Sequence, residues 1–248
     1  MTHRLDRKVA LVTGAGSGIG LATARRLAEE GSVVVAGILD ETQRAAVDGL
    51  DVVILDVRSE GDWDRALAHV AAAQGGLDIL VNNAGIHRPG RAEETTAETW
   101  REVMTINLWG TFLGCRAAIP LMRRRGGGAI VNVSSIAGIR GTPGGVAYSA
   151  LKGGIVSMTL ALAADHAVDK IRINCVCPGA VTTPIMDAII QRAPDPAARR
   201  ATFAARHPLN RMAEPAEIAA AIAFLAGEDA SFMTGVTLPV DGGRSGRG

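Results

Sequence analysis

The chain has 248 residues, of which 48% are hydrophobic and 21% are charged, and its formal net charge is +1. This length favours one large α/β domain over two small ones, and the apolar fraction excludes wholesale disorder. A nearly neutral charge gives no electrostatic signal for nucleic acid or an anionic membrane, so we predict neither as a partner.

The number of cysteines and the first residues of the chain indicate the cellular compartment of the protein. Three cysteines are too few for a disulfide framework, and we expect small buried side chains. Cys175 and Cys177 are predicted to point to opposite faces of a strand, which argues against a bond between them. Residues 1–14 lack the apolar stretch of a secretory signal, and no run approaches the length of a membrane span. We therefore predict a cytoplasmic protein.

Short apolar runs alternate with helical patterns along the chain. Strands are predicted at residues 8–13, 33–36, 52–55, 77–81, 129–133, 171–176 and 236–240. Helices are predicted at residues 19–30, 63–73, 97–124, 146–167 and 215–226, and residues 188–206 are irregular but helix-prone. Within the long helix, Gly110, Gly114 and Pro120 indicate close packing or a bend.

Continuous apolar strands that alternate with helices predict a parallel sheet covered on both faces. The predicted fold is α/β: a single-domain, Rossmann-type, doubly wound parallel sheet of about seven strands over residues 1–248. Ligands in such sheets bind beyond the carboxyl ends of the strands, at a topological switch point. The chemistry is therefore expected just after the strands.

A glycine-rich turn follows the first predicted strand and reads TGAGSGIG at residues 13–20. Missing Cβ atoms let the backbone approach a pyrophosphate, and the following helix offers free N–H groups to the anion. The spacing differs from the strict G-x-G-x-x-G pattern and lacks the Lys-Ser/Thr ending of a P-loop. The turn alone is weak evidence, but its place between strand and helix favours dinucleotide binding.

Further motifs occur in order along the chain. They are NNAG at residues 82–85, Asn107, NVSS at residues 132–135, Tyr148 followed by Lys152, Pro178-Gly179 through Thr183, and a terminal stretch at residues 235–243. From about Leu5 to Gly243, this set resembles the short-chain dehydrogenase/reductase family, in particular its 3-oxoacyl-acyl-carrier-protein reductase branch. The resemblance implies an enzyme that transfers a hydride between NAD(P)(H) and a secondary alcohol or ketone.

Tyr148 and Lys152 lie four positions apart in a helical pattern, so they share a face. A free phenol, with a pKa of about 10, is a poor proton carrier at neutral pH, and a nearby ammonium lowers that pKa. The resemblance implies that Tyr148 is the general acid/base and that Lys152 lowers its pKa and binds the nicotinamide ribose. It further implies that Ser135 polarises the substrate oxygen, whereas Ser134 bonds backbone, and that Asn107 holds a water in a relay toward Lys152.

The cofactor residues implied by the resemblance follow several strands. They are Gly14, Ser17, Gly18, Ile19, Gly20, Asp40, Asp56, Val57, Asn82, Ala84, Gly85, Tyr148, Lys152, Pro178, Gly179, Val181 and Thr183. Asp56 would accept from the adenine amine, Asn82 and Gly85 would lie along the ribose and pyrophosphate, and Thr183 would bind the carboxamide or phosphate side. No metal is predicted.

The choice between NAD and NADP depends on the segment after the second strand. Gly37 occupies the family's usual acidic position, and Ser17 and Ile38 stand where NADP users often carry a cation. Asp40 is near enough to reach the ribose, although a helix N-cap is the alternative, and Arg44 is the one nearby cation. We favour NAD, with NADP as the alternative.

Substrate walls are expected from residues 87–90, 136–146 and 184–211, the last having the character of a lid. His87, Arg88 and Arg140 are candidates to meet a polar or anionic substrate, with solvated loop residues as the alternative. The resemblance also implies a homotetramer, with close helix contacts at Gly110, Gly114 and residues 160–167. The rival interpretations are a non-catalytic nucleotide-sensing protein and a dehydratase or epimerase on the same scaffold.

Overall fold

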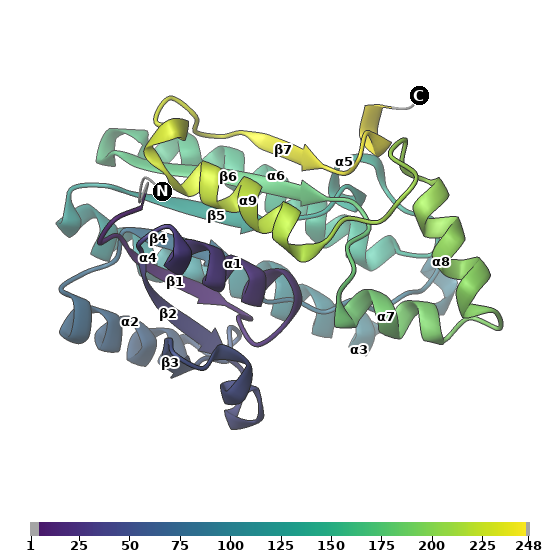
Figure 1. The fold of residues 1–248 in the computed structure, drawn as a ribbon, viewed down its shortest axis with the longest axis horizontal. Helices are drawn as coiled ribbons and strands as arrows, with labels where there is room; N and C mark the ends of the chain where they lie inside the picture. Colours follow the sequence, from purple (N-terminus) through teal and green to yellow (C-terminus); the bar gives the residue numbers. More distant parts are fainter. Residues whose placement is uncertain (1–4, 247–248) are drawn as a thin grey trace.

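One parallel sheet of seven strands organises the chain in a computed structural model that describes residues 5–246 (Figure 1). The predicted domain also included residues 1–4 and 247–248, which lie outside the described residues. In chain order the strands are β1 (Val9–Thr13), β2 (Val33–Ile38), β3 (Asp51–Ile54), β4 (Ile79–Asn82), β5 (Gly128–Val133), β6 (Ile171–Pro178) and β7 (Thr237–Val240). Their order across the sheet, β3-β2-β1-β4-β5-β6-β7, confirms the predicted doubly wound topology.

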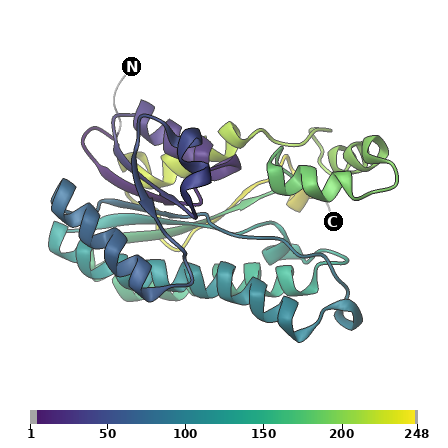
Figure 2. The same cartoon turned by 90° about the horizontal axis from the view of Figure 1, so that it is seen from below.

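Helices cover both faces of this sheet (Figure 2). One face carries α1 (Gly18–Glu29) and α9 (Pro215–Ala226); the other carries α2 (Glu60–Gln74), α4 (Gly110–Arg125) and α6 (Val146–His166). In β1, Ala10 and Val12 belong to the core on the first face, whereas Val9 and Leu11 belong to the core on the second. Because both faces are buried, the strands are apolar without alternation, as the sequence pattern indicated.

The helix predicted at residues 97–124 is three elements. They are α3 (Ala97–Val103), a π-helical stretch η3 (Met104–Trp109) and α4. The prediction of one continuous helix was wrong because its 3.6-residue pattern does not reveal a local change of backbone hydrogen bonding. Inside η3, the Asn107 amide donates to Val103 O at 2.9 Å and to Ile86 O at 3.2 Å, which ties the π-helical stretch to the loop after β4.

The glycines of this region pack within the chain. A Cβ on Gly110 would lie 2.8 Å from Val57 Cγ2, and one on Gly114 would lie 2.3 Å from Asn82 Oδ1. Both residues are buried. The close contact at these glycines is therefore an internal one, between α4 and residues that follow β3 or end β4.

The cysteine prediction was wrong in its geometry. Cys175 and Cys177 lie two positions apart in β6, and residues i and i+2 of a strand share a face. Their sulfur atoms are 4.0 Å apart, and Cys115, Cys175 and Cys177 are free and buried, as small core side chains were expected to be.

The helix-prone segment after β6 forms two regular helices, α7 (Pro184–Gln191) and α8 (Pro196–Ala205). Each begins with proline, and the side chains of Thr183 and Asp195 accept a hydrogen bond from the first turn of α7 and α8 respectively. Residues 188–206 were predicted to be irregular because the sequence analysis did not recognise Thr183 and Asp195 as N-cap residues. The remaining elements are the short helix α5 (Ala137–Arg140) and the 3-10 turns η1 (Glu41–Val47), η2 (Ala92–Glu94), η4 (Ala167–Asp169), η5 (Glu228–Ala230) and η6 (Arg244–Gly246).

One described helical stretch, Val146–Asp169, is long and apolar enough to cross a membrane by length and composition. The expectation that no run approaches that length was therefore wrong. The stretch comprises α6 and η4, covers the sheet beside β6 and carries Tyr148 and Lys152. In the fold this stretch packs along one face of the sheet, with 33% of its apolar window buried.

Candidate active site

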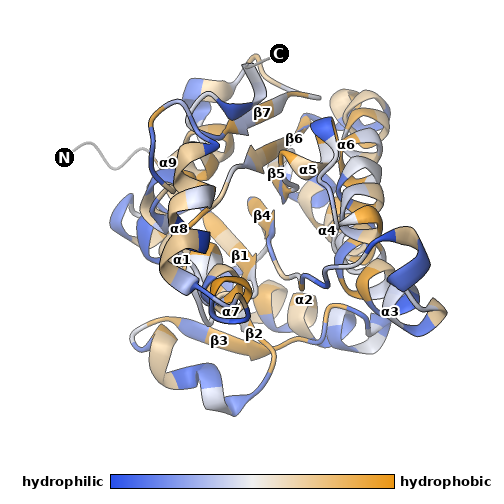
Figure 3. Cartoon of the chain, turned by 90° about the vertical axis from the view of Figure 1, so that its right-hand side faces the viewer, coloured by the Kyte–Doolittle hydropathy of each residue, from blue (hydrophilic) through white to orange (hydrophobic). Residues whose placement is uncertain are grey.

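A cavity of about 840 Å³ opens at the carboxyl ends of the strands. Figure 3 looks onto these ends, where apolar strands lie between two layers of helices. Most of the predicted site residues line the cavity: Gly14, Ser17, Gly18, Ile19, Asp56, Val57, Ala84, Gly85, Asn107, Ser135, Tyr148, Lys152, Pro178, Gly179, Val181 and Thr183. The predicted residues Gly20, Asp40 and Asn82 are not among its lining. The sheet order thus brings together side chains that lie far apart in sequence.

The glycine turn lies at the switch point between β1 and β4. Gly14 and Gly18 have φ values of 63° and 53°, a region that favours glycine. A Cβ on Gly20 would lie 2.2 Å from Gly14 O, so Gly20 permits the turn itself. Ser17 is the N-cap residue of α1, and its side chain makes no capping hydrogen bond. The first N–H groups of α1 are therefore suited to an anion such as a dinucleotide pyrophosphate.

The loop after β4 is bonded directly to this turn. Asn83 Nδ2 donates to Thr13 O at 2.9 Å, and Thr13 Oγ1 accepts from the backbone N–H groups of Asn83 and Ala84 at 3.0 Å each. Asn82 instead points into the core, where its amide donates to Asn132 Oδ1 at 2.9 Å. Asn82 was predicted along the ribose, but the structure buries it. Asn83 lines the cavity, and the sequence analysis passed over it.

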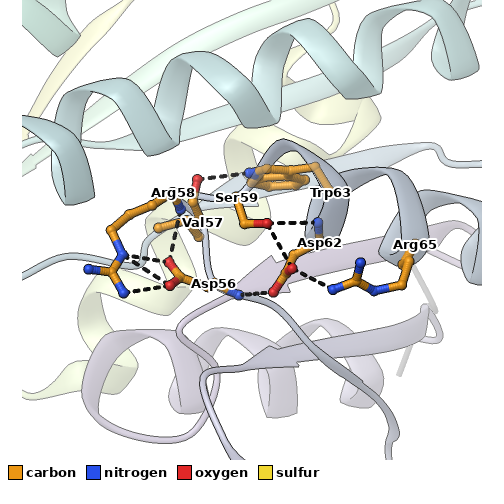
Figure 4. A network of polar contacts seen from close by, with 7 residues as sticks. All are labelled: Asp56, Val57, Arg58, Ser59, Asp62, Trp63 and Arg65. Atoms are coloured by element: carbon orange, nitrogen blue, oxygen red, sulfur yellow. Dashed lines mark hydrogen bonds and ion pairs between the residues drawn. The ribbon is translucent and has the colours of Figure 1, made fainter.

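The loop after β3 forms a fixed wall of the cavity (Figure 4). Arg58 binds both carboxylate oxygens of Asp56, with Nη2 at 2.6 Å from Oδ2. This guanidinium lowers the pKa of Asp56 below its ordinary value, so the carboxylate is ionised at neutral pH. Trp63 Nε1 donates to Val57 O at 3.1 Å and holds the loop against α2. The predicted contact of Asp56 with adenine stays a prediction.

Asp40 is a helix N-cap residue, which was the alternative to its predicted contact with the ribose. Its carboxylate caps η1 by accepting from Thr42 N at 2.9 Å, and the side chain is exposed. The other acid of this turn, Glu41, pairs with Arg44 at its surface. Leu39 and Gln43 line the cavity here, and Gln43 Oε1 accepts from Leu39 N at 3.1 Å.

Ser135 and Tyr148 line the same cavity, and the Ser135 hydroxyl lowers the pKa of the phenol. Ser135 Oγ accepts from Ala137 N at 3.1 Å, so its single proton is directed away from that backbone group. Burial raises the pKa of Tyr148 to about 12, and the Ser135 hydroxyl lowers it only in part. This direction is opposite to the predicted one, because burial disfavours the charged phenolate. As predicted, Ser134 bonds backbone: its hydroxyl donates to Lys152 O at 2.8 Å.

The Lys152 ammonium is buried beside this pair. Nζ donates to Val133 O at 2.8 Å and lies 5.6 Å from the centroid of the Tyr148 ring. Burial lowers the pKa of Lys152 to about 8. An ammonium has three protons, and two remain after the bond to Val133 O, which suits Lys152 to bind hydroxyl oxygens such as those of a ribose.

Asn107 and His87 complete this part of the cavity. Both amide protons of Asn107 are used by Val103 O and Ile86 O, and Oδ1 accepts from Ile86 N at 3.2 Å. A water relay through this side chain stays a prediction, and the bonds shown hold the loop that carries His87. The His87 ring packs edge-on to Tyr148 with centroids 4.6 Å apart, and its buried Nδ1 has no hydrogen-bond partner. Burial and nearby cations lower the pKa of His87, so the ring is neutral at pH 7.

The segment after β6 closes back on the glycine turn. A Cβ on Gly18 would lie 3.2 Å from Thr183 Cγ2, so the two loops are in near contact. Thr183 Oγ1 caps α7 by accepting from Met186 N. His207, which sequence reasoning missed, accepts from Ala180 N through Nε2 at 3.1 Å and fixes the segment that contains Pro178, Gly179 and Val181. Across residues 5–246, no group of three or more His, Cys, Asp or Glu side chains is arranged to hold a metal ion.

Comparisons with known proteins agree with this geometry. A family model described as Enoyl-(Acyl carrier protein) reductase matches residues 14–245. The cis-4-hydroxycyclohexanecarboxylate dehydrogenase of Sinomonas cyclohexanicum is 44% identical, over 98% of each chain. The 3-oxoacyl-[acyl-carrier-protein] reductase of Thermotoga maritima is 38% identical, over 97% of this chain and 98% of the relative. The ligand-free aldohexose dehydrogenase of Thermoplasma acidophilum superposes with a TM-score of 0.93 at 33% identity and covers 100% of this chain and 98% of that structure.

Proposed function

Because this chain belongs to the short-chain dehydrogenase/reductase family, we propose that Tyr148, Ser135 and Lys152 carry the proton transfer that accompanies its hydride transfer. The protein is an NAD(P)-dependent oxidoreductase that acts on secondary alcohols or ketones. The observation that supports these roles is that Ser135, Tyr148 and Lys152 line one cavity with the glycine turn, with Lys152 Nζ 5.6 Å from the centroid of the Tyr148 ring.

When bound, the nicotinamide supplies or accepts the hydride, and the remaining steps belong to the protein. In the reducing direction, Ser135 donates a hydrogen bond to the carbonyl oxygen while Tyr148 gives its proton to that oxygen. A phenol with a raised pKa is fully protonated at neutral pH, which suits a proton donor. Lys152 holds the cofactor's ribose and places a positive charge beside the phenolate that forms. In the oxidising direction Tyr148 must first lose its own proton, which the positive charges of Lys152 and an oxidised nicotinamide favour, and the phenolate then removes the alcohol proton.

NAD is the cofactor that we propose, with NADP as the alternative. Asp40 does not line the cavity, so the support no longer comes from an acid near the ribose. The support for NAD comes instead from the arginines near the predicted adenosine end of the cavity. Arg44 is paired with Glu41, and Arg58 is paired with Asp56. Neither guanidinium is free of a carboxylate to receive the 2′-phosphate of NADP.

Absorbance at the nicotinamide band, followed with a panel of secondary alcohols and ketones, tests the reaction and the cofactor together. We expect turnover of at least one alcohol/ketone pair, with kcat/KM for NAD(H) above that for NADP(H). Binding of the cofactor without turnover across the panel would support the nucleotide-sensing alternative, and a clear preference for NADPH would reverse the choice of cofactor.

We further propose a cytoplasmic homotetramer with residues 184–211 as a lid over the substrate. Free buried cysteines support a reducing compartment. Trp109, at the end of η3, and Leu160, on α6, are 41% and 50% exposed and provide apolar surface for a helix interface in place of the internal glycines. Light scattering should give the mass of four chains, and Leu160→Glu should lower it; a monomeric wild type contradicts the proposal.

A further inference from the structure

Besides Arg58, three arginines line the same cavity as Tyr148. Arg199 and Arg206 lie on and just after α8, and Arg244 lies in η6, which follows β7. Figure 2 shows the C-terminal turn (yellow) beside the two lid helices (green). The three residues come from separate parts of the sequence, so their approach is a product of the fold.

Phe203 holds two of these guanidinium groups in place. The Arg199 and Arg206 guanidinium carbons lie 4.7 Å and 5.2 Å from the centroid of the Phe203 ring, which is itself buried and lines the cavity. Stacking on an aromatic face fixes the plane of a guanidinium and leaves its N–H groups free to donate. Burial and the neighbouring charges of Arg206 and Arg140 lower the pKa of Arg244, so like charges are held together here.

No carboxylate neutralises this group among residues 5–246. Other arginines near the site do have acidic partners: Arg88 with Glu102 and Arg200 with Asp187. No ion pair involves Arg199, Arg206 or Arg244 within the part of the chain that the structure describes. Asp241 attracts Arg244, but its carboxylate accepts from Gly243 N and Ser245 N. The one described acid that lines the cavity is Asp56, which Arg58 occupies.

The cofactor's phosphates do not account for this charge. The glycine turn follows β1, whereas Arg244 follows β7, and β4, β5 and β6 lie between these two strands. Four strand spacings of about 4.8 Å separate the two ends by roughly 19 Å. Arg244 therefore lies toward the substrate end of the cavity. Arg206 is near enough to Arg244 for their charges to repel, and Arg199 stacks on the same Phe203 ring as Arg206, which groups the three at that end.

We propose that the substrate of the reaction proposed above is a secondary alcohol or ketone that carries a carboxylate, which Arg199, Arg206 and Arg244 bind. Planar guanidinium groups match the two oxygens of a carboxylate, and charge-assisted hydrogen bonds of this kind are strong. Binding the anion at these residues would place the carbinol carbon toward Tyr148 and Ser135 at the other side of the cavity. Arg88 and Arg140, which the sequence analysis considered for this role, do not line the cavity; Arg88 pairs with Glu102, and Arg140 donates to Arg244 O and Ser245 O.

A matched pair of substrates tests this inference. We expect kcat/KM for cis-4-hydroxycyclohexanecarboxylate to exceed that for its neutral carboxamide at least tenfold. Arg206→Gln and Arg244→Gln should each reduce this ratio by about tenfold, the lower end of the range for a charged hydrogen bond. The control Arg88→Gln, at an arginine outside the cavity, should leave the ratio unchanged.

A measurement on the wild type tests carboxylate binding without relying on variants that could fail to fold. Cyclohexanecarboxylate should inhibit the oxidation of an alcohol substrate competitively. Its inhibition constant should be at least tenfold lower than that of cyclohexanecarboxamide. Equal inhibition by the two, or equal kcat/KM for the two substrates with no effect of either variant, overturns the inference while the proposed reaction stands. Absence of turnover with every alcohol and ketone in the panel overturns the proposed reaction instead.

Discussion

Replacement of Tyr148 by Phe should lower kcat by roughly 100- to 10,000-fold, the range that general acid–base catalysis supplies. The ring contact with His87 is kept, and only the phenol hydroxyl is lost. Steady-state rates at the nicotinamide band measure the effect. The chain offers no second phenol, because Tyr148 is the single tyrosine of the sequence.

Cofactor binding is the internal control for this variant. Fluorescence titration with NADH should give a Kd within about tenfold of wild type, since at most one hydrogen bond to the cofactor is removed. Wild-type turnover in Tyr148→Phe would contradict the role of the phenol. A large loss of NADH binding would show that the variant disturbs the cavity, and the fall in kcat would then not be chemical.

Replacement of Lys152 by Met should stabilise the fold at pH 7 while it abolishes most activity. Burial lowers the pKa of Lys152 from 10.5 to about 8. This shift corresponds to about 3.5 kcal/mol at about 1.4 kcal/mol per unit, offset in the variant by about 1.5–3 kcal/mol for the lost charged bond to Val133 O. We expect the free energy of unfolding to rise by about 0.5–2 kcal/mol, measured by urea denaturation.

The pH dependence gives the sign of this effect. Below pH 8 the amine is charged in the folded and the unfolded chain, so the folded state bears the full cost of a buried charge. Between pH 8 and 10.5 the unfolded chain binds more protons, and wild-type stability rises with pH. The advantage of Lys152→Met should therefore shrink across this window. Lys8→Met, at an exposed lysine paired with Glu228, should show no such trend; a constant difference for Lys152→Met would contradict the assigned shift.

Strand positions and the order of motifs were predictable because their signals are local. A buried parallel strand is apolar on both faces, and Val12, Val35 and Val81 lie in such runs. The shared family pattern then predicted that Tyr148, Lys152 and the glycine turn belong to one site. The structure confirms that these residues line one cavity.

Properties that depend on packing were not predictable in this way. The spacing of Tyr148 and Lys152 indicated an attractive charge, but it carried no information on how far burial would oppose it. The pairing of Arg58 with Asp56, and the stacking of Arg199 and Arg206 on Phe203, depend on side-chain partners that only the folded chain selects. The π-helical turn at Asn107 likewise depends on its bonds to Ile86, 21 positions away.

The phenol of Tyr148 can be titrated directly, because the phenolate absorbance of this single tyrosine is free of other contributions. In the protein alone, we expect the phenol to remain protonated past its ordinary pKa of 10.0, in accord with a value raised to about 12. With saturating oxidised NAD, the positive nicotinamide should lower that pKa, and Tyr148→Phe should show no phenolate signal. A pKa at or below 10.0 in the protein alone, unchanged by the cofactor, would contradict the account of Tyr148 as a buried acid beside the nicotinamide.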